Sequence, residues 1–223
     1  MVEQSIRMSN SSTAWPHRDN ATNPSFVPPS WLNIEGSREV QDSGPVEPES
    51  VLFVCTGNIC RSAFAAAYLA HLIQGSGITV ESAGIGALVG RGMDERALLL
   101  ASQLGVDGSL HRARQLTGRM LGGASLVVVF GPEHYDWVQE NNPEAIAKTV
   151  AVGQFVSGLE QDVGSQVQHR SISDLLSVVK QMQPVPDKSS WIKDPYKKDG
   201  SEYIQIMREV IDAVGRLRGK VRW

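Results

Sequence analysis

From residue 51 onward, short apolar runs alternate with segments in which apolar residues recur every three or four positions. Four runs rich in β-branched residues predict strands, at residues 51–54, 78–82, 126–130 and 148–152. Between these runs the spacing predicts helices, at residues 62–73, 94–104 and 132–140. Strands that alternate with helices are typical of βαβ units. We therefore expect an α/β fold, a small doubly wound four-stranded parallel sheet with helices on both faces.

The final segment gives the clearest helical pattern. Its apolar residues recur at spacings of four and three: Tyr203, Met207, Val210, Val214, Leu217 and Val221. This spacing places one apolar stripe against a core. Ser201, just before the stripe, is the expected N-cap.

Two segments depart from this rhythm. Residues 1–49 hold six of the eleven prolines and many Ser and Asn residues, and they predict a disordered, acidic N-terminal tail. Residues 50–223 predict one domain. Within it, residues 157–190 contain a polar Gly/Gln stretch and a short helical candidate at 174–182, and we expect them to form a surface insertion.

Composition excludes several classes of function. No apolar run approaches the roughly 20 residues that span a bilayer, so we expect no membrane insertion. A formal charge of −3 without a basic run gives no electrostatic footprint for nucleic acid. The start of the chain does not read as a secretory signal. The two cysteines lie in one turn-like segment and could not staple distant parts of a fold, which favours a reducing, cytoplasmic location.

The segment from Cys55 to Ser62 carries the candidate chemistry. It leads from a predicted strand into a predicted helix, where loop N–H groups and the helix dipole converge on an anion. Arg61, six residues after Cys55, can fork onto two phosphate oxygens. The same donors stabilise a thiolate, so Cys55 is the expected nucleophile. Gly57 gives the turn its freedom, and Ser62 either donates its hydroxyl to the thiolate or caps the helix.

A phenolate or alkoxide leaving group needs a proton from a general acid. Asp194-Pro195-Tyr196 offers one, because a proline restrains the preceding residue to extended geometry and would hold its carboxylate on a defined loop. The alternative reading is an ordinary turn-forming Asp-Pro pair.

These two motifs, together with residues 82–90 and 111–116, resemble the low molecular weight protein tyrosine phosphatase family. The resemblance extends to bacterial members paired with exopolysaccharide-synthesis tyrosine kinases. It implies a phosphatase type I-like fold and hydrolysis of phosphotyrosine through a cysteinyl-phosphate. It also implies that Cys55 is the nucleophile, Arg61 the phosphate clamp and Asp194 the acid that later activates water.

The resemblance implies roles for further residues. It implies that the phosphate-binding loop contains Thr56, Gly57, Asn58, Ile59, Cys60 and Ser62. It implies that the loop is braced by hydrogen bonds from Asn58, Ser62, Ser82 and His111. Leu88 and Tyr196 would flank the pocket mouth. It also supports Cys60 as a disulfide partner for oxidised Cys55, the alternative being a small apolar loop residue. Ala63 and Ala66 depart from the family, which commonly has Pro and Glu there.

Two other functions fit the same loop. One is an arsenate reductase that uses an external thiol, since the chain has no further cysteines to resolve an intermediate. The other is a catalytically silent phosphotyrosine-binding module. We expect no cofactor and no metal, because no ligand cluster with suitable spacing occurs. The expected partner is a phosphotyrosine protein, a bacterial tyrosine kinase or a polysaccharide-assembly protein.

Overall fold

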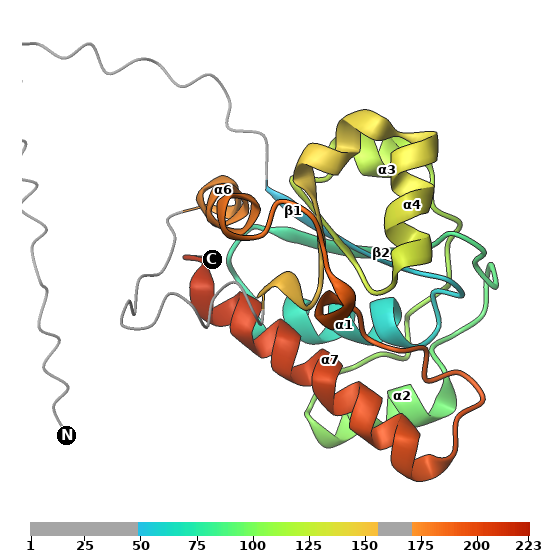
Figure 1. The fold of residues 1–223 in the computed structure, drawn as a ribbon. Coiled ribbons are helices and arrows are strands. Elements are labelled where there is room, and N and C mark those ends of the chain that lie inside the picture. The colour runs from blue at the N-terminus through green and yellow to red at the C-terminus, as the bar shows by residue number, and fades with distance from the viewer. Residues whose placement is uncertain (1–48, 156–170) are drawn as a thin grey trace, which may run out of the picture. The chain divides into compact units, whose positions relative to one another are not determined.

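The computed structural model describes residues 49–155 and 171–223 (Figure 1). The tail expected over residues 1–49 therefore lies, apart from Glu49, outside the described residues, as does the first part of the expected insertion. Four strands form one parallel sheet: β1 (Ser50–Cys55), β2 (Thr79–Gly84), β3 (Leu126–Val129) and β4 (Thr149–Ala151). Their order is β2-β1-β3-β4. The four-stranded parallel sheet is thus confirmed, with boundaries shifted by one or two residues.

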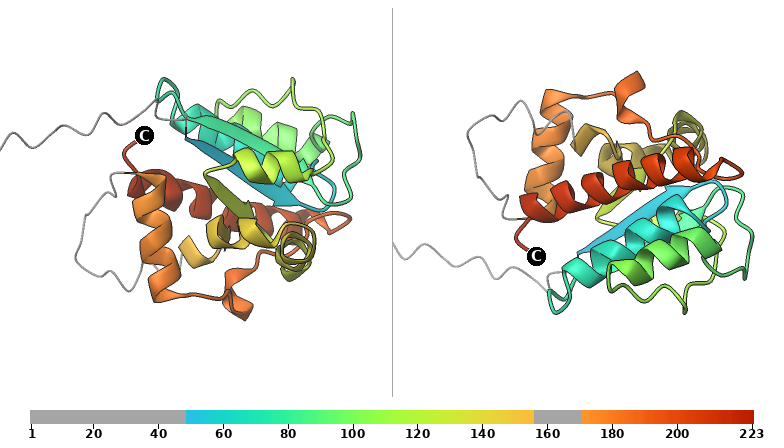
Figure 2. Two further views of the ribbon diagram at one scale, coloured as in Figure 1. Left: turned by 90° about the horizontal axis from the view of Figure 1, so that it is seen from above. Right: turned by 90° about the horizontal axis from the view of Figure 1, so that it is seen from below.

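Helices pack on both faces of the sheet, as the pattern predicts. Those on one face are α1 (Arg61–Leu72), α2 (Glu95–Gln103), α6 (Ile172–Met182) and α7 (Gly200–Lys220). On the other face lie α3 (Gly118–Gly123), α4 (Pro132–Asn141) and the 3-10 helix η2 (Pro143–Lys148). A second 3-10 turn, η3 (Lys188–Ser190), precedes the last loop. Figure 1 shows α3 and α4 above the sheet, and Figure 2 shows α7 running beside α1 below it.

The alternation of side chains along β1 supplies both halves of the core. Val51, Phe53 and Cys55 face the cluster formed with α1 and α7, whereas Leu52 and Val54 face the cluster formed with α3 and α4. All five are at most 2% exposed. A strand buried on both faces explains why this segment reads as a continuous apolar run.

The prediction of a surface insertion is wrong for the helical part of that segment. In α6, Ile172, Leu175 and Val179 are at most 1% exposed and belong to the same core cluster as α7. Their spacing of three and four places one apolar face of α6 against the core. Residues 171–182 therefore contribute to the fold.

The expected N-cap of the last helix is also corrected. Asp199, and not Ser201, precedes α7, and its carboxylate accepts hydrogen bonds from the N–H groups of Ser201 and Glu202 at 3.0 and 2.9 Å. A carboxylate that satisfies two of the free N–H groups also complements the positive end of the helix dipole.

The topology determines where a site can form. The chain runs from β1 to β2 on one side and then crosses to β3 on the other side of β1, so the strand order reverses between β1 and β3. In open parallel sheets, ligands bind in the crevice outside the carboxyl ends of the strands at such a reversal. Cys55 is the last residue of β1.

Candidate active site

The loop between β1 and α1 is anchored to neighbouring segments by hydrogen bonds to its carbonyl groups. The carbonyl oxygens of five consecutive residues accept hydrogen bonds from neighbouring segments: Cys55 from Ile85 N–H, Thr56 from Gly86, Gly57 from Leu88, Asn58 from His111 Nε2 and Ile59 from Asp94. In the described part of the chain, the N–H groups of residues 57–60 donate no hydrogen bond. They remain available to an anion in front of α1.

Cys55 Sγ lies 2.8 Å from Ser62 Oγ. Asn58 Nδ2 donates to Ser62 Oγ at 2.9 Å, so the hydroxyl hydrogen of Ser62 is left for the sulfur. Ala83 O, the other acceptor, is farther away at 3.4 Å. Ser62 is the second residue of α1 and does not cap it, because the N-cap position is Cys60. Of the two roles expected for Ser62, the geometry therefore favours donation to the thiolate.

Asn58 ties the loop to three other segments. Its φ of 52° lies in the left-handed region, which Asn tolerates better than most residues. Its Nδ2 also donates to Ser82 Oγ at 2.9 Å, and its Oδ1 accepts from Arg114 N–H at 2.8 Å. His111 Nε2 donates to the Asn58 carbonyl at 2.7 Å. Asn58, Ser62, Ser82 and His111 are thus brought together around the loop, as the resemblance implies.

Gly84, at the end of β2, must be a glycine for the loop to pack against the sheet, and the sequence alone predicts no role for it. A Cβ built there would lie 2.3 Å from the Thr56 carbonyl oxygen and 3.1 Å from the Asn58 backbone nitrogen. Any side chain would therefore push the loop away from the sheet. No local signal distinguishes Gly84 from other glycines.

Arg61 and Asp194 meet across the pocket. Arg61 Nη2 lies 3.2 Å from Asp194 Oδ2, and Arg61 Nη1 donates to the Ile192 carbonyl at 3.1 Å. The guanidinium side chain is 3% exposed and the carboxylate 49%. Asp194 Oδ1 accepts the N–H of Tyr196 at 3.1 Å, which fixes the carboxylate on its loop. The two groups expected from separate motifs therefore face one site.

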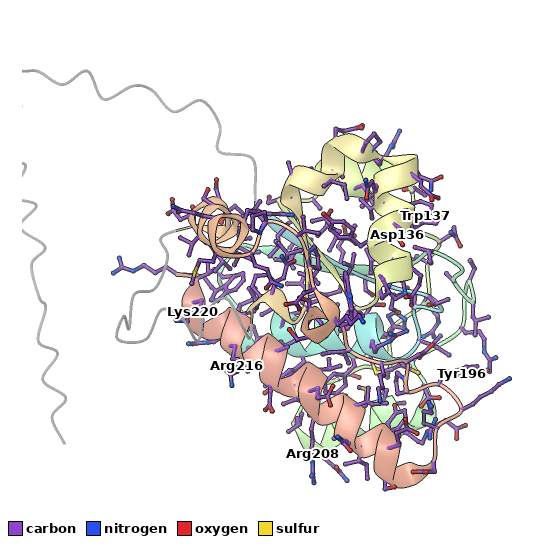
Figure 3. All side chains as sticks on the ribbon, in the orientation of Figure 1. Asp136, Trp137, Tyr196, Arg208, Arg216 and Lys220 are labelled. Carbon is purple, nitrogen blue, oxygen red and sulfur yellow. The ribbon has the colours of Figure 1, made fainter. Side chains whose placement is uncertain are left out.

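These side chains enclose a pocket of about 190 Å³. It is lined by Cys55, Thr56, Gly57, Ile59, Cys60, Arg61, Gly86, Leu88, Asp194 and Tyr196. Leu88 and Tyr196 are 37% and 44% exposed, which suits the expected pocket rim. Figure 3 shows Tyr196 on the loop before α7. The pocket has a polar floor and an apolar mouth.

Cys60 lines the same pocket as Cys55, and both cysteines are free. Burial, and then the charge of Asp94, raise the pKa of Cys60 to about 12, so it stays a thiol at neutral pH. We predict that peroxide attacks Cys55 first and that Cys60 then condenses with the sulfenic acid, releasing water. After brief peroxide and then dithiothreitol, the parent should regain most activity and Cys60→Ser little. Equal recovery by both would leave Cys60 without a redox role.

His134, at the start of α4, is a further polar residue beside the pocket that the sequence analysis did not single out. It is fully buried, and its Nε2 lies 3.0 Å from Thr56 Oγ1. Its Nδ1 accepts the N–H of Gly131 at 2.8 Å. A lone histidine in a predicted helix carries no sequence signal for this position.

The described residues hold neither a cluster of metal ligands nor a helix that could span a membrane. Residues 49–155 and 171–223 contain no group of three or more His, Cys, Asp or Glu residues that could hold a metal ion. Within the same residues, no helix is both long and apolar enough to cross a bilayer.

A cysteine and an arginine six residues apart, on an anion-binding loop at the carboxyl edge of a parallel sheet, define a site of the kind that cysteine-dependent phosphatases use. A sequence model described as low molecular weight phosphotyrosine protein phosphatase matches residues 50–174, more than half of the chain. The chain therefore belongs to the low molecular weight phosphotyrosine protein phosphatase family. This confirms the family that the motifs predict.

Individual relatives carry two kinds of name. The probable low molecular weight protein-tyrosine-phosphatase EpsP of Ralstonia solanacearum is 39% identical over 107 residues, 48% of this chain and 72% of the relative. A protein-arginine-phosphatase of Geobacillus stearothermophilus is 39% identical over 116 residues, 52% of this chain and 77% of the relative. The crystal structure of the Erwinia amylovora tyrosine phosphatase AmsI has a TM-score of 0.60 at 27% identity, covering 78% of this chain and 95% of that one.

Proposed function

We propose that this protein hydrolyses phosphotyrosine in proteins through a cysteinyl-phosphate on Cys55. The observation that carries the proposal is the 2.8 Å contact between Cys55 Sγ and Ser62 Oγ, inside a pocket that Arg61 and Asp194 also line. The apolar side chains at the mouth supply a surface for an aromatic ring. Membership of the family and relatives named as protein-tyrosine-phosphatases support the same reading.

In the first step the Cys55 thiolate attacks phosphorus and the bond to the tyrosine oxygen breaks. The electron pair leaves on that oxygen, which takes a proton from Asp194. Arg61 and the loop N–H groups hold the equatorial oxygens, where charge is greatest in the transition state. Before this can happen, the phosphate must displace the Asp194 carboxylate from Arg61, and the freed carboxylate must take up from solvent the proton that it then donates.

In the second step water attacks the cysteinyl-phosphate and the sulfur–phosphorus bond breaks. Asp194, now a carboxylate, takes the proton from water, and inorganic phosphate leaves. The hydroxyl of Ser62, which accepts a hydrogen bond from Asn58, donates its hydrogen to the leaving thiolate and stabilises it. The enzyme returns to its starting protonation state.

Asp194→Ala should lower kcat/KM for a phosphotyrosine peptide by roughly a hundredfold or more. For 4-nitrophenyl phosphate the factor lost should be about ten times smaller. Tyrosine leaves as a basic phenolate that needs the proton, whereas nitrophenolate departs readily without it. kcat/KM isolates the first step, so the shared hydrolysis of the intermediate does not obscure the contrast. Equal losses would mean that Asp194 only positions its loop.

The other functions can be separated on one preparation. Turnover of a phosphotyrosine peptide, of a phosphoarginine peptide and of arsenate with an external thiol would be compared. A phosphoarginine leaving group is a cation, and Asp194 is the only carboxylate that lines the described pocket. We therefore expect the phosphotyrosine peptide to be preferred. Binding of that peptide without turnover would instead indicate a silent binding module.

The partner proposed from the resemblance is a bacterial tyrosine kinase or a polysaccharide-assembly protein that carries phosphotyrosine. A cytoplasmic location is part of the proposal, because the two cysteines are free thiols. Phosphoproteomics of a deletion strain would identify the substrate as a protein whose phosphotyrosine accumulates.

A further inference from the structure

His134 is a neutral imidazole with one defined tautomer. Its Nδ1 accepts the N–H of Gly131 at 2.8 Å, so in the neutral ring the hydrogen resides on Nε2. The ring is 0% exposed. Burial, and then the positive charge of Arg61, lower the pKa of His134 to about 3. Although Glu133 Oε1 lies 3.2 Å from Nε2, the ring stays uncharged because Nδ1 accepts a hydrogen bond and so cannot carry a second hydrogen.

The tautomer constrains Thr56. Nε2 lies 3.0 Å from Thr56 Oγ1 and 3.2 Å from Glu133 Oε1. Because Nε2 carries the hydrogen, Thr56 cannot donate its own hydrogen to the ring, however Nε2–H is shared between the two oxygens. In the described part of the chain, Thr56 Oγ1 has no second partner. The hydroxyl hydrogen is thus left for a group outside the protein.

Thr56 is one of the residues that line the pocket. Thr56 follows Cys55 directly and lines the same pocket as Arg61. A Cβ built on Gly86 would lie 4.0 Å from Thr56 Cγ2, so the methyl group faces Gly86 while the oxygen faces His134. A β-branched side chain has few rotamers, and the contact of Thr56 Oγ1 with His134 favours this one.

We propose that His134 is a positioning residue that holds the Thr56 oxygen as an acceptor and so directs its hydroxyl hydrogen to a phosphoryl oxygen in the pocket. The inference rests on the proposed function. No proton is transferred: the hydroxyl adds one neutral donor to the loop N–H groups and Arg61. Because the phosphoryl oxygens are charged, this hydrogen bond is of the stronger kind.

The test is a double-mutant cycle on kcat/KM for an aryl phosphate. Thr56→Val keeps the shape and removes the hydroxyl. His134→Asn keeps an acceptor near Nδ1 for the Gly131 N–H but removes the donor to Thr56. Each change should lower kcat/KM roughly tenfold, and the double variant should lose no more than about twice either single loss. A double loss near a hundredfold would mean that His134 acts independently of Thr56, and the proposal would be wrong.

A second pair of variants separates positioning from folding. His134→Gln can place an amide N–H near the Nε2 position, so it should recover most of the rate lost in His134→Asn. Thr56→Ser should lose less than Thr56→Val. Equal losses in the Gln and Asn variants, with equal melting temperatures, would contradict the proposal.

Calorimetric titration with orthovanadate, which adopts a five-coordinate geometry like that of the transition state, needs no turnover. Thr56→Val and His134→Asn should each weaken vanadate binding roughly tenfold, and the parent affinity in both would overturn the proposal. If the parent enzyme hydrolysed no aryl phosphate, the proposed function would fail while this titration still tested the hydroxyl.

Discussion

Cys55→Ser should abolish turnover of aryl phosphates, by at least about four orders of magnitude, while phosphate still binds. A serine hydroxyl is not ionised near neutral pH, and Ser62 then offers its hydrogen to an oxygen that is not a nucleophile. The loop N–H groups and Arg61 remain in place. Removing the thiolate also removes a like-charge repulsion with the phosphate dianion, so the phosphate Kd should be equal or lower.

Two measurements check this result. Single-turnover assays with the parent enzyme should trap phosphate on sulfur after acid quench, and Cys55→Ser should trap none. Calorimetry with inorganic phosphate should show binding by both. If the variant kept more than a few per cent of the parent rate, the covalent mechanism would be wrong. If it lost phosphate binding as well, the serine would have disturbed the loop and the rate would say nothing about the nucleophile.

The fold could be predicted where one local signal dominates. Strands β1 and β3 follow from β-branched apolar runs that are buried on both faces, and α7 follows from its long apolar stripe. The pattern does not predict the short helix α3, because this helix spans only six residues and its sequence ends in two glycines. The pattern predicts the wrong N-cap for α7, Ser201 in place of Asp199, because sequence alone does not show which of two nearby polar side chains reaches the first free N–H groups.

The site divides in the same way. Cys55, Arg61 and Ser62 are near in sequence, so the loop and its chemistry could be read directly. Ser82 and His111 could be assigned only through the family resemblance, since nothing local brings them to Asn58. The contact of Thr56 with His134 spans 78 residues and that of Arg61 with the Ile192 carbonyl spans 131. Such contacts depend on tertiary packing, which one sequence does not reveal.

Arg61→Lys should lower kcat/KM by roughly a thousandfold although the positive charge is kept. The guanidinium makes two contacts in different directions, with the Ile192 carbonyl at 3.1 Å and Asp194 at 3.2 Å. One contact orients the group and the other marks where phosphate oxygens would bind. A lysine ammonium is a single point that cannot satisfy the carbonyl and fork onto two oxygens at once.

The loss of kcat/KM expected for Arg61→Lys is large because the Arg61 side chain is buried. The Arg61 side chain is 3% exposed, so a misplaced ammonium there would be neither hydrated nor fully paired. Arg208→Lys is the matched control, since Arg208 is exposed on α7 (Figure 3), and it should keep the parent kcat/KM and melting temperature. The loss should fall mainly on kcat, because the fork fits the five-coordinate transition state better than bound phosphate. A loss confined to KM would show that Arg61 binds substrate and transition state equally.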